Sequence, residues 1–405
     1  MSDDSTPDPD GEPEADPGTD LDGEARSGSQ SRSGTRAGPE PAADARGEPG
    51  AGGDDRPELV ERLLDGEYRA LARVISRIED RAPGHRDLVR ALHAHTGGAE
   101  VIGVTGSPGA GKSTLVDGLA RRYRDAGLTV GVIAIDPSSP FTGGSVLGDR
   151  VRMASTTGDM DTFVRSMSAR GELGGLSTAT TDAVTALDAF GKDRILVETV
   201  GAGQNEVDVV RTADTVAVLV PPGSGDDVQM LKAGILEIGD VFVVNKADRS
   251  GADRTVRDLR EMLEGRSDHS RTRTGHHGPD AVPGDDATGG SEDGNAWEPR
   301  IVETVATDGT GVEELIDALG EHAAFLHSSG RREQLARRRY ADEIRTLLRS
   351  DATRMVAREA ERHGGIEALA RRVHERETDP YTAVETVLEP LRDRVEHGEE
   401  DPAGK

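Results

Sequence analysis

Residues 106–113 read Gly-Ser-Pro-Gly-Ala-Gly-Lys-Ser, follow the apolar stretch Val101–Thr105 and precede a helical pattern that runs from Ser113 to Arg124. A strand, a glycine-rich loop and a helix form the context in which G-x-x-x-x-G-K-[ST] binds phosphate. The glycines let backbone N–H groups turn toward phosphate oxygens, and the helix directs its unpaired N–H groups at the same anion. The stretch therefore predicts a binding site for a nucleoside triphosphate.

The loop also predicts a role for each of its polar side chains. Lys112 is placed to neutralise the outer phosphates, and the Ser113 hydroxyl to bind Mg²⁺. Lys112 is therefore a candidate catalytic residue. The predicted phosphate contacts are Gly106, Ser107, Pro108, Gly109, Ala110, Gly111, Lys112, Ser113 and Thr114.

Strand and helix patterns alternate around this loop, which indicates a parallel sheet. Several of the strands are continuously apolar, as strands covered on both faces should be. We predict an α/β fold of the P-loop NTPase type: a mostly parallel sheet with helices on both faces and helical extensions at both ends of the chain. The expected strands are 101–105, 129–135, 194–198, 215–220, 241–245 and 301–305, with a possible further strand at 162–167.

Composition divides the chain into segments. Residues 1–57 contain 15 acidic residues against five arginines and almost no large apolar side chain, so this segment is too polar to fold alone. A second polar segment, 266–297, predicts a disordered insertion. The predicted units are an acidic tail (1–57), N-terminal helices (58–97), the nucleotide-binding P-loop domain with its insertion (98–326), and a C-terminal helical region suited to dimerisation (327–396).

The formal net charge of −27 argues against binding to nucleic acid or an anionic membrane through a broad basic surface. Only five basic residues are lysines, and an acid-rich, lysine-poor surface fits a halophilic protein, although a GC-rich coding bias would give a similar composition. The chain has no cysteine, so disulfides and thiolate metal sites are excluded. No apolar run reaches the ~20 residues of a membrane span, and the first residues do not resemble a signal peptide. We expect a cytoplasmic protein.

A second motif, Asn245-Lys246-Ala247-Asp248, directly follows an apolar strand. The Asp248 carboxylate can accept hydrogen bonds from the N1–H and the exocyclic amine of guanine, whereas adenine would leave it unpaired. Asn245 is placed to tie this loop to the phosphate loop, and the Lys246 stem to cover the base. Backbone groups of Val305, Ala306 and Thr307 are expected to reach the carbonyl oxygen of the base. GTP is therefore the predicted substrate.

Carboxylates at two other strand ends suit Mg²⁺. Glu198 ends one strand, and the Gly201 N–H three residues later is placed to sense the γ-phosphate. Asp136 and Asp149 flank a Gly/Ser/Pro-rich segment typical of a switch, although Asp136 could simply cap a turn. Glu198 and Gly201 join Lys112 as candidate catalytic residues, and the predicted metal ligands are Ser113, Asp136, Asp149 and Glu198.

Four longer motifs then give a specific resemblance. These motifs are residues 136–145 with 147–150, 164–167 with 173–176, 198–206, and 222–229 with 232–234 and 237–238. In this order they resemble segments of the methylmalonyl-CoA mutase-associated GTPases, the MeaB/ArgK-like family. The resemblance covers about 60–390 and leaves out the tail and the insertion. Ala202 stands where many signalling GTPases have a water-orienting glutamine, so slow intrinsic hydrolysis is expected.

The resemblance implies a GTP-hydrolysing chaperone, typically a homodimer, that gates adenosylcobalamin delivery to an acyl-CoA mutase and protects that enzyme. Two alternatives stay open at this point. One is a kinase or ATPase linked to amino-acid transport. The other is a metallochaperone that uses His269, His276 and His277 of the insertion, although such histidines are more often solvated.

Overall fold

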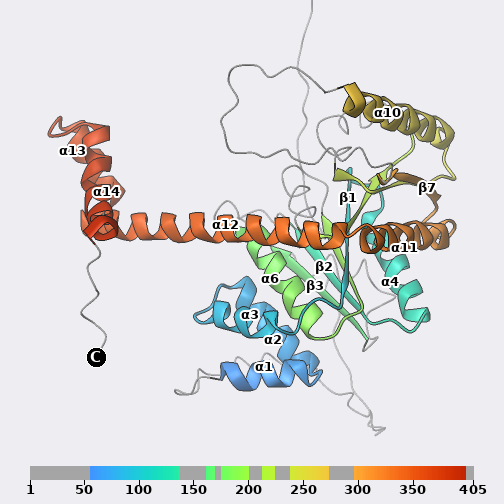
Figure 1. The fold of residues 1–405 in the computed structure, drawn as a ribbon, viewed down its shortest axis with the longest axis horizontal. Helices are drawn as coiled ribbons and strands as arrows, with labels where there is room; N and C mark the ends of the chain where they lie inside the picture. The colour runs from blue at the N-terminus through green and yellow to red at the C-terminus, as the bar shows by residue number, and fades with distance from the viewer. Residues whose placement is uncertain are drawn as a thin grey trace, which may run out of the picture. The chain divides into compact units, whose positions relative to one another are not determined.

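The computed structural model describes residues 55–136, 161–168, 175–199, 212–223, 238–272 and 296–397. Its centre is a seven-stranded sheet in the order β3-β2-β4-β1-β5-β6-β7, and every pair of neighbouring strands is parallel (Figure 1). The fold class predicted from the sequence is confirmed. The strands are β1 (Glu100–Gly106), β2 (Val130–Asp136), β3 (Thr162–Ser168), β4 (Arg194–Thr199), β5 (Thr215–Val220), β6 (Val241–Asn245) and β7 (Arg300–Thr304).

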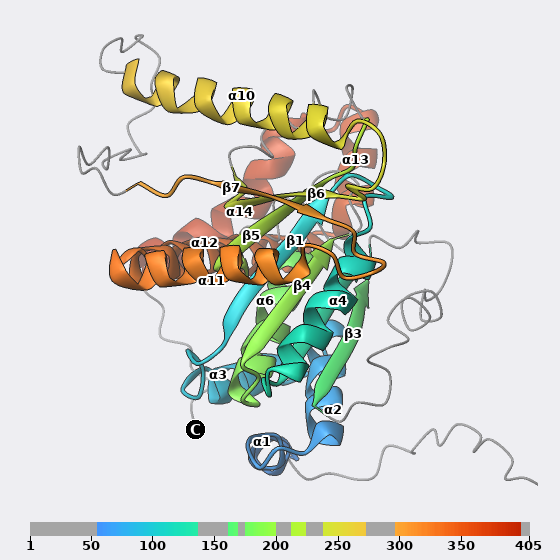
Figure 2. The ribbon, with the colours of Figure 1, turned by 90° about the vertical axis from the view of Figure 1, so that its right-hand side faces the viewer.

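Helices cover both faces of this sheet (Figure 2). α4 (Lys112–Asp125) and α11 (Val312–Ser328) share one hydrophobic core with Ala217 and Leu219 of β5. α6 (Gly175–Ala189) and α10 (Ala252–Thr272) share the other core with the intervening valines of the same strand. Successive side chains of a strand point to opposite faces, so a strand buried on both sides must be apolar throughout. This is why β5, Thr-Val-Ala-Val-Leu-Val, is buried at every position.

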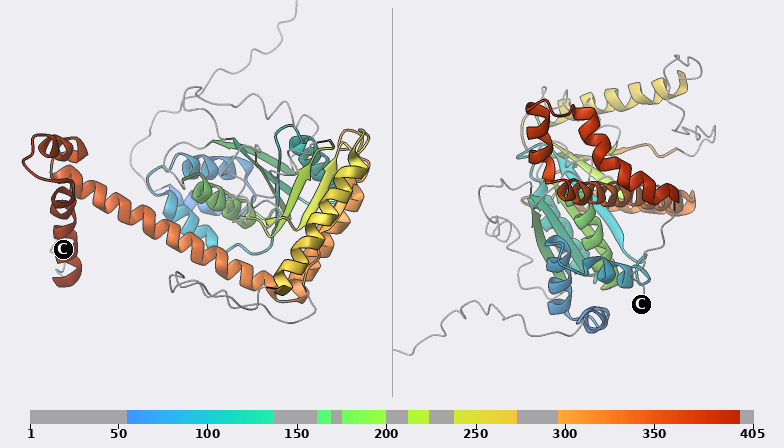
Figure 3. Two further views of the ribbon diagram at one scale, coloured as in Figure 1. Left: turned by 90° about the horizontal axis from the view of Figure 1, so that it is seen from above. Right: turned by 90° about the vertical axis from the view of Figure 1, so that its left-hand side faces the viewer.

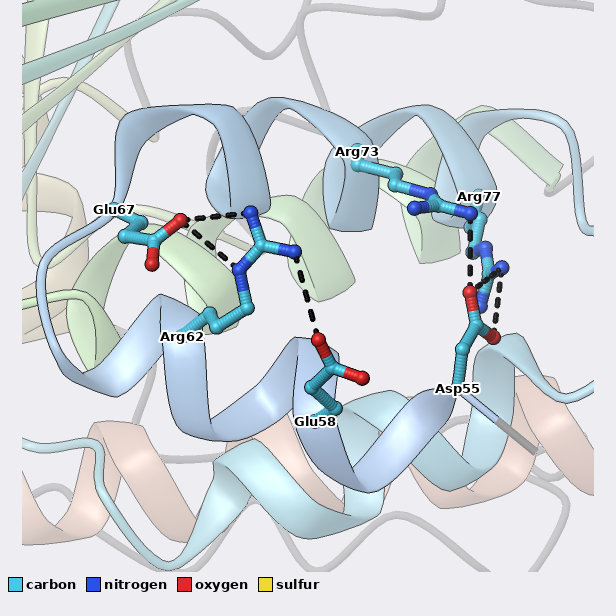
Figure 4. A network of polar contacts seen from close by, with 6 residues as sticks. All are labelled: Asp55, Glu58, Arg62, Glu67, Arg73 and Arg77. Atoms are coloured by element: carbon cyan, nitrogen blue, oxygen red, sulfur yellow. Dashed lines mark hydrogen bonds and ion pairs between the residues drawn. The ribbon is translucent and has the colours of Figure 1, made fainter. Parts of the chain in front are cut away.

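Three N-terminal helices form a layer outside α6: α2 (Tyr68–Glu79) and α3 (His85–His93) pack on α6, and α1 (Arg56–Leu64) packs on α2 and α3. Their apolar residues recur at helical spacing, and Leu71, Val74 and Ile75 are fully buried. Figure 4 shows the polar side of α1 and α2, where Arg62 binds Glu67 and Arg77 binds Asp55. Exposed pairs of this kind contribute at most about 1 kcal/mol each, so apolar burial holds the three helices in place.

The C-terminal helices have a small core of their own. α12 (Arg331–Arg362) follows α11, and α13 (Gly365–His374) and α14 (Pro380–His397) pack on its C-terminal part (Figures 1 and 3). Ala360, Leu369, Ala383 and Val387 form this core. Beside it the buried Glu359 carboxylate accepts hydrogen bonds from two arginines, Arg362 and Arg394.

Two predicted segment boundaries need correction. α1 begins at Arg56, with Asp55 paired to Arg73 and Arg77, so the tail ends earlier than residue 57. α10 continues to Thr272, and the Trp297 indole N–H donates to the Asp240 carbonyl at 2.8 Å, so both ends of the predicted insertion 266–297 belong to the fold. A polar final helical turn and a single aromatic residue carry no periodic pattern, which is why the sequence suggested otherwise. Within the described ranges, no helix combines the length and apolarity that a bilayer span requires.

Candidate functional site

The predicted site residues meet where the carboxyl ends of the central strands lie. β1 lies between β4 and β5. After β1 the chain forms β2, β3 and β4 on one side of it, and then β5, β6 and β7 on the other side. Open parallel sheets bind ligands at the point where the strand order reverses in this way. A pocket of about 480 Å³ opens there, lined by Gly109, Gly111, Lys112, Ser113, Thr114, Ala134, Ile135, Glu198, Thr199 and Lys246.

The phosphate loop leaves β1 through two glycines that no other residue could replace. Gly106 has φ +138°, and a Cβ at this position would lie 2.2 Å from the Leu219 carbonyl oxygen of β5. Gly111 has φ +98°, and its Cβ would lie 2.4 Å from Nδ2 of Asn245. Both positions combine a left-handed backbone with close contact, which only glycine tolerates. The loop can therefore keep its backbone close to the strand ends and turn into α4.

Lys112 folds back over this loop. Its Nζ donates to the carbonyl oxygens of Gly106 and Ser107 at 2.7 and 2.9 Å. The side chain is only 6% exposed and lines the pocket, so its charge lies where a phosphate chain would run. Removing that positive charge would leave backbone amides alone to hold a polyanion.

Ser113 and Glu198 meet at the pocket edge. The Ser113 hydroxyl donates to Oε1 of Glu198 at 2.6 Å, and Glu198 is 7% exposed. Glu198 lies beside Val104 in the β4–β1 register, so the two strands bring the carboxylate next to the loop. Next to it, the buried hydroxyls of Thr199 and Thr105 lie 3.0 Å apart and join the same two strand ends. One hydroxyl and one carboxylate oxygen facing a phosphate site are the donors that Mg²⁺ prefers.

Asn245 connects three segments of the site. Its Nδ2 donates to the Ala110 carbonyl at 2.7 Å, and its Oδ1 accepts from the Thr304 hydroxyl and the Ala306 N–H, each at 3.1 Å. The side chain is 2% exposed, so these bonds form away from water, where an unmade bond is costly. The predicted link between the guanine loop and the phosphate loop is present in this geometry.

Lys246 crosses the mouth of the pocket. It has φ +64°, and its Nζ donates to the Gly109 carbonyl at 2.6 Å. This left-handed residue turns the chain sharply after β6, and Asp248 follows two positions later with its side chain exposed. The aliphatic stem of Lys246 thus lies between the phosphate loop and the position expected for the base.

In the segment after β7, the hydrogen bonds of the backbone amides differ from those that we expected. The Val305 N–H donates to Thr310, and the Ala306 N–H is held by Asn245. Two of the three backbone amides that we assigned to the base carbonyl therefore have intramolecular partners in this structure. Thr307, which is exposed in the turn that follows, is the third.

Several predicted residues lie outside what the structure describes. Asp136 is the last residue of β2, but its side chain is not described, and Asp149 and Gly201 belong to undescribed ranges. The same holds for His276, His277 and the side chain of His269. Among the residues that are described, no group of three or more His, Asp or Glu side chains is arranged to hold a metal.

Sequence reasoning missed three threonines that support the site, Thr105, Thr199 and Thr304, of which Thr199 also lines the pocket. Each of the three is fully buried, and each hydroxyl bonds another side chain of the site. The available signal was position: a threonine near the carboxyl end of an otherwise apolar strand, next to a functional residue.

Comparison with known proteins agrees with this geometry. The family model described as "Methylmalonyl Co-A mutase-associated GTPase MeaB" matches residues 71–361, most of the chain. The chain belongs to this MeaB GTPase family. It is a P-loop GTPase, as its sequence predicted.

Three similar proteins illustrate the range of the MeaB family's relatives. A "Putative GTPase" of Pyrococcus abyssi is 46% identical over 334 residues, which cover 82% of this chain and 96% of the relative. "GTPase ArgK" of Escherichia coli is 34% identical over 293 residues, 71% of this chain and 82% of that protein. A crystal structure titled "LAO/AO transport system kinase" matches with a TM-score of 0.55 and 23% identity, covering 84% of this chain and 99% of that one, and so supports the fold.

Proposed function

We propose that this GTPase is a magnesium-dependent chaperone of an adenosylcobalamin-dependent acyl-CoA mutase, methylmalonyl-CoA mutase by family association. GTP binding and hydrolysis would gate delivery of the cofactor to the mutase and protect that enzyme from inactivation. The observation that carries the proposal is one connected site in a member of a family described as mutase-associated: Asn245 joins the guanine loop to the phosphate loop, and Ser113 joins Glu198 to it.

Triphosphate binding would rest on the loop and on Lys112. The amides of residues 106–113 and the start of α4 supply N–H donors and the positive end of the helix. Lys112 now binds two carbonyls of its own loop. It would exchange these for phosphate oxygens, so its ammonium group would have hydrogen-bond acceptors in both states and an opposite charge in the bound state.

The residues present fit Mg²⁺. Ser113 and Glu198 already place two oxygens 2.6 Å apart at the pocket edge, and Asp136 ends the strand that borders the pocket through Ala134 and Ile135. We assign Ser113 as a direct ligand, with Glu198, Asp136 and Asp149 contributing carboxylates. When bound, the ion neutralises charge that develops on the phosphates. The protein's part is to fix those oxygens and to couple the switch segments after Asp136 and Glu198 to the nucleotide.

Base selection is assigned to Asp248 together with the turn at Val305–Thr307. Asn245 fixes this turn to the phosphate loop, so base and phosphate recognition share one rigid connection. Thr307 is the residue of the turn that we assign to the base carbonyl, because the other two amides have partners. Slow intrinsic turnover follows from Ala202, and a partner protein would then supply or position the missing catalytic group.

The experiment is a GTPase assay with and without an adenosylcobalamin-dependent methylmalonyl-CoA mutase. We expect the mutase to raise the rate of GTP hydrolysis by about tenfold or more, in the range that partner proteins reach by completing a catalytic site. Because the chain carries a net charge of −27, the assay should be run at several salt concentrations.

Lys112→Ala is the control that must abolish both the basal and the stimulated rate. If the mutase neither binds nor changes the rate at any salt concentration while GTP is still hydrolysed, the chaperone assignment fails and the GTPase assignment stands.

A further inference from the structure

A second pocket, of about 550 Å³, lies between α3, α6 and α12, with Ile78 of α2 at its edge. An ion pair holds α12 across it: Arg86 of α3 binds Asp351 with two hydrogen bonds of 2.8 Å. Part of the wall is apolar, from Val89, Ile344 and Leu347 among others. This pocket shares no lining residue with the nucleotide site.

Asp182 of α6 is the buried polar group of this pocket. It is 9% exposed and lines the cavity, and the described part of the chain provides neither a hydrogen bond nor an ion pair to its carboxylate. Glu343 of α12 lines the same cavity, again with no hydrogen bond or ion pair from any described residue. A buried carboxylate without a hydrogen-bond partner is costly, and the buried Asp182 together with the half-buried Glu343 in one cavity favours binding of a cation or a proton. Burial, followed by the charge of Glu343, raises the pKa of Asp182 to about 7.

The rim of the pocket has the opposite charge. Arg86 and Arg354 both pair with the single carboxylate of Asp351, so these three groups carry one excess positive charge, and the charge of Arg86 also acts on Asp182. Their side chains are 41% and 44% exposed, so this charge lies at the opening, whereas Asp182 lies inside. The pocket is thus negative within and positive at its edge, and an aliphatic wall lies between.

We propose that this pocket binds a small amphoteric molecule, with its guanidinium or ammonium group between Asp182 and Glu343 and its anionic group toward Arg86 and Arg354. The class is that of a basic amino acid or a close analogue, whose methylene stem would lie against Ile344 and Leu347. Such a ligand would join α6 of the nucleotide-binding domain to α12. It requires no bound nucleotide, so the inference stands apart from the proposed mutase partnership.

Isothermal titration of the full chain at pH 8 with three probes tests the charge pattern. L-Arginine carries both charges, agmatine lacks the carboxylate, and L-citrulline replaces the guanidinium with a neutral ureido group. We expect saturable one-to-one binding of arginine, and affinities lower by about tenfold or more for citrulline and by a smaller factor for agmatine. Absence of saturation by arginine up to about 10 mM, or equal binding of citrulline and arginine, overturns the proposal.

Variants assign the two ends of the site. Asp182→Asn and Glu343→Gln should each weaken arginine binding by about tenfold. Arg354→Gln should weaken arginine but leave agmatine unchanged. Glu361→Gln removes a charge from an exposed position of α12 and should change the affinity for neither arginine nor agmatine. Basal GTP hydrolysis shows that each variant is folded. Equal losses of arginine affinity in all four variants would also contradict the proposed site.

Discussion

Asp248 follows β6 at the end of a tight turn, where Lys246 has φ +64°. Its carboxylate is assigned to the N1–H and exocyclic amine of guanine, and xanthine replaces that amine with an oxygen. Asp248→Asn should therefore lower GTP affinity about 100-fold, roughly 3 kcal/mol, and improve affinity for xanthosine triphosphate. Competition binding with GTP, ATP and XTP measures the change.

The control for this substitution is Asp253→Asn, an exposed aspartate of α10 five residues further on, which should leave all three affinities unchanged. A variant at position 248 that keeps its GTP preference would remove Asp248 from base recognition. That result would leave the assignment of the phosphate loop unchanged, because the predicted phosphate contacts do not involve Asp248.

Asp182 makes stability depend on pH. Its pKa is about 7 in the folded protein against 3.8 for an ordinary aspartate, because of burial and then the charge of Glu343. The folded state therefore binds this proton more tightly than the unfolded state between about pH 4 and 7. The free energy of unfolding should fall as pH rises through this window, by at most about 4 kcal/mol from this group.

Urea unfolding of the wild type and of Asp182→Asn across that window measures this contribution. The asparagine cannot titrate, so the free energy of unfolding of Asp182→Asn should change less with pH and should exceed that of the wild type at pH 8. Glu361→Gln should show the same dependence on pH as the wild type. Parallel curves for the wild type and the asparagine variant would refute the assignment. The other charged groups that face this cavity are common to all three proteins: Arg81, His85, Arg86, Arg90, His93, Glu343, Asp351 and Arg354.

At the level of elements, the strands were the most predictable part of the chain. All seven occur within about one residue of the predicted bounds, including the possible strand that became β3. A strand covered on both faces has to be apolar at every position, and this continuous signal leaves little doubt about its ends. The phosphate loop was equally predictable from the sequence, because Gly106 and Gly111 occupy positions where any side chain would collide with β5 or Asn245.

Other elements carried no comparable signal. α10 extends to Thr272 through a polar stretch, and Trp297 is fixed by one hydrogen bond to Asp240 and by ring contacts with His322 and Phe325. The partners of Val305 and Ala306 depend on which segments the fold brings to Asn245. Asp182 and Glu343 likewise line one cavity although the two residues are more than 150 positions apart in sequence. Contacts of this kind are set by tertiary structure, and one sequence does not specify them.

α12 is attached to the amino ends of the strands by Arg339. Its guanidinium donates to the Thr212 carbonyl at 3.2 Å and binds Asp214, which also accepts from the Val101 N–H. Arg339→Ala should loosen the first turns of α12 and speed their amide hydrogen exchange by about tenfold. GTP affinity should change little, because the nucleotide site lies at the opposite ends of these strands.

Hydrogen exchange read by mass spectrometry locates this effect, and Arg337→Ala is the matched control. Arg337 lies on the same helix, is 80% exposed and pairs only at 3.5 Å with the equally exposed Glu333. Unchanged protection of α12 in Arg339→Ala would show that the Arg339 contacts do not hold the helix and that its other contacts, such as the pair between Arg86 and Asp351, are sufficient.

For the whole molecule, the distribution of exposed apolar surface points to self-association. Every large hydrophobic side chain that is exposed in the described part of the chain belongs to α12, α13 or α14, and none belongs to the sheet or its covering helices. Exposed apolar residues gathered in this way mark an interaction surface. They are Tyr340, Ile344, Leu348, Met355, Val356, Ile366, Tyr381, Val384 and Val395.

We therefore expect a homodimer in which the α13–α14 pair contributes to the interface. Ile366 and Tyr381 are 67% and 84% exposed, and replacing both with aspartate would place two charges where apolar contact is expected. The double variant should have the mass of one chain in light scattering, whereas the wild type should have twice that mass. Arg254→Asp changes the net charge by the same two units on α10, where the side chain is 80% exposed, and should remain dimeric. If the double variant also keeps the dimer mass, Ile366 and Tyr381 are not needed for the interface, and the exposed apolar residues of α12 become the next candidates. If the wild type itself has the mass of one chain, this apolar surface must instead meet a different protein, and the mutase is then the first candidate to test.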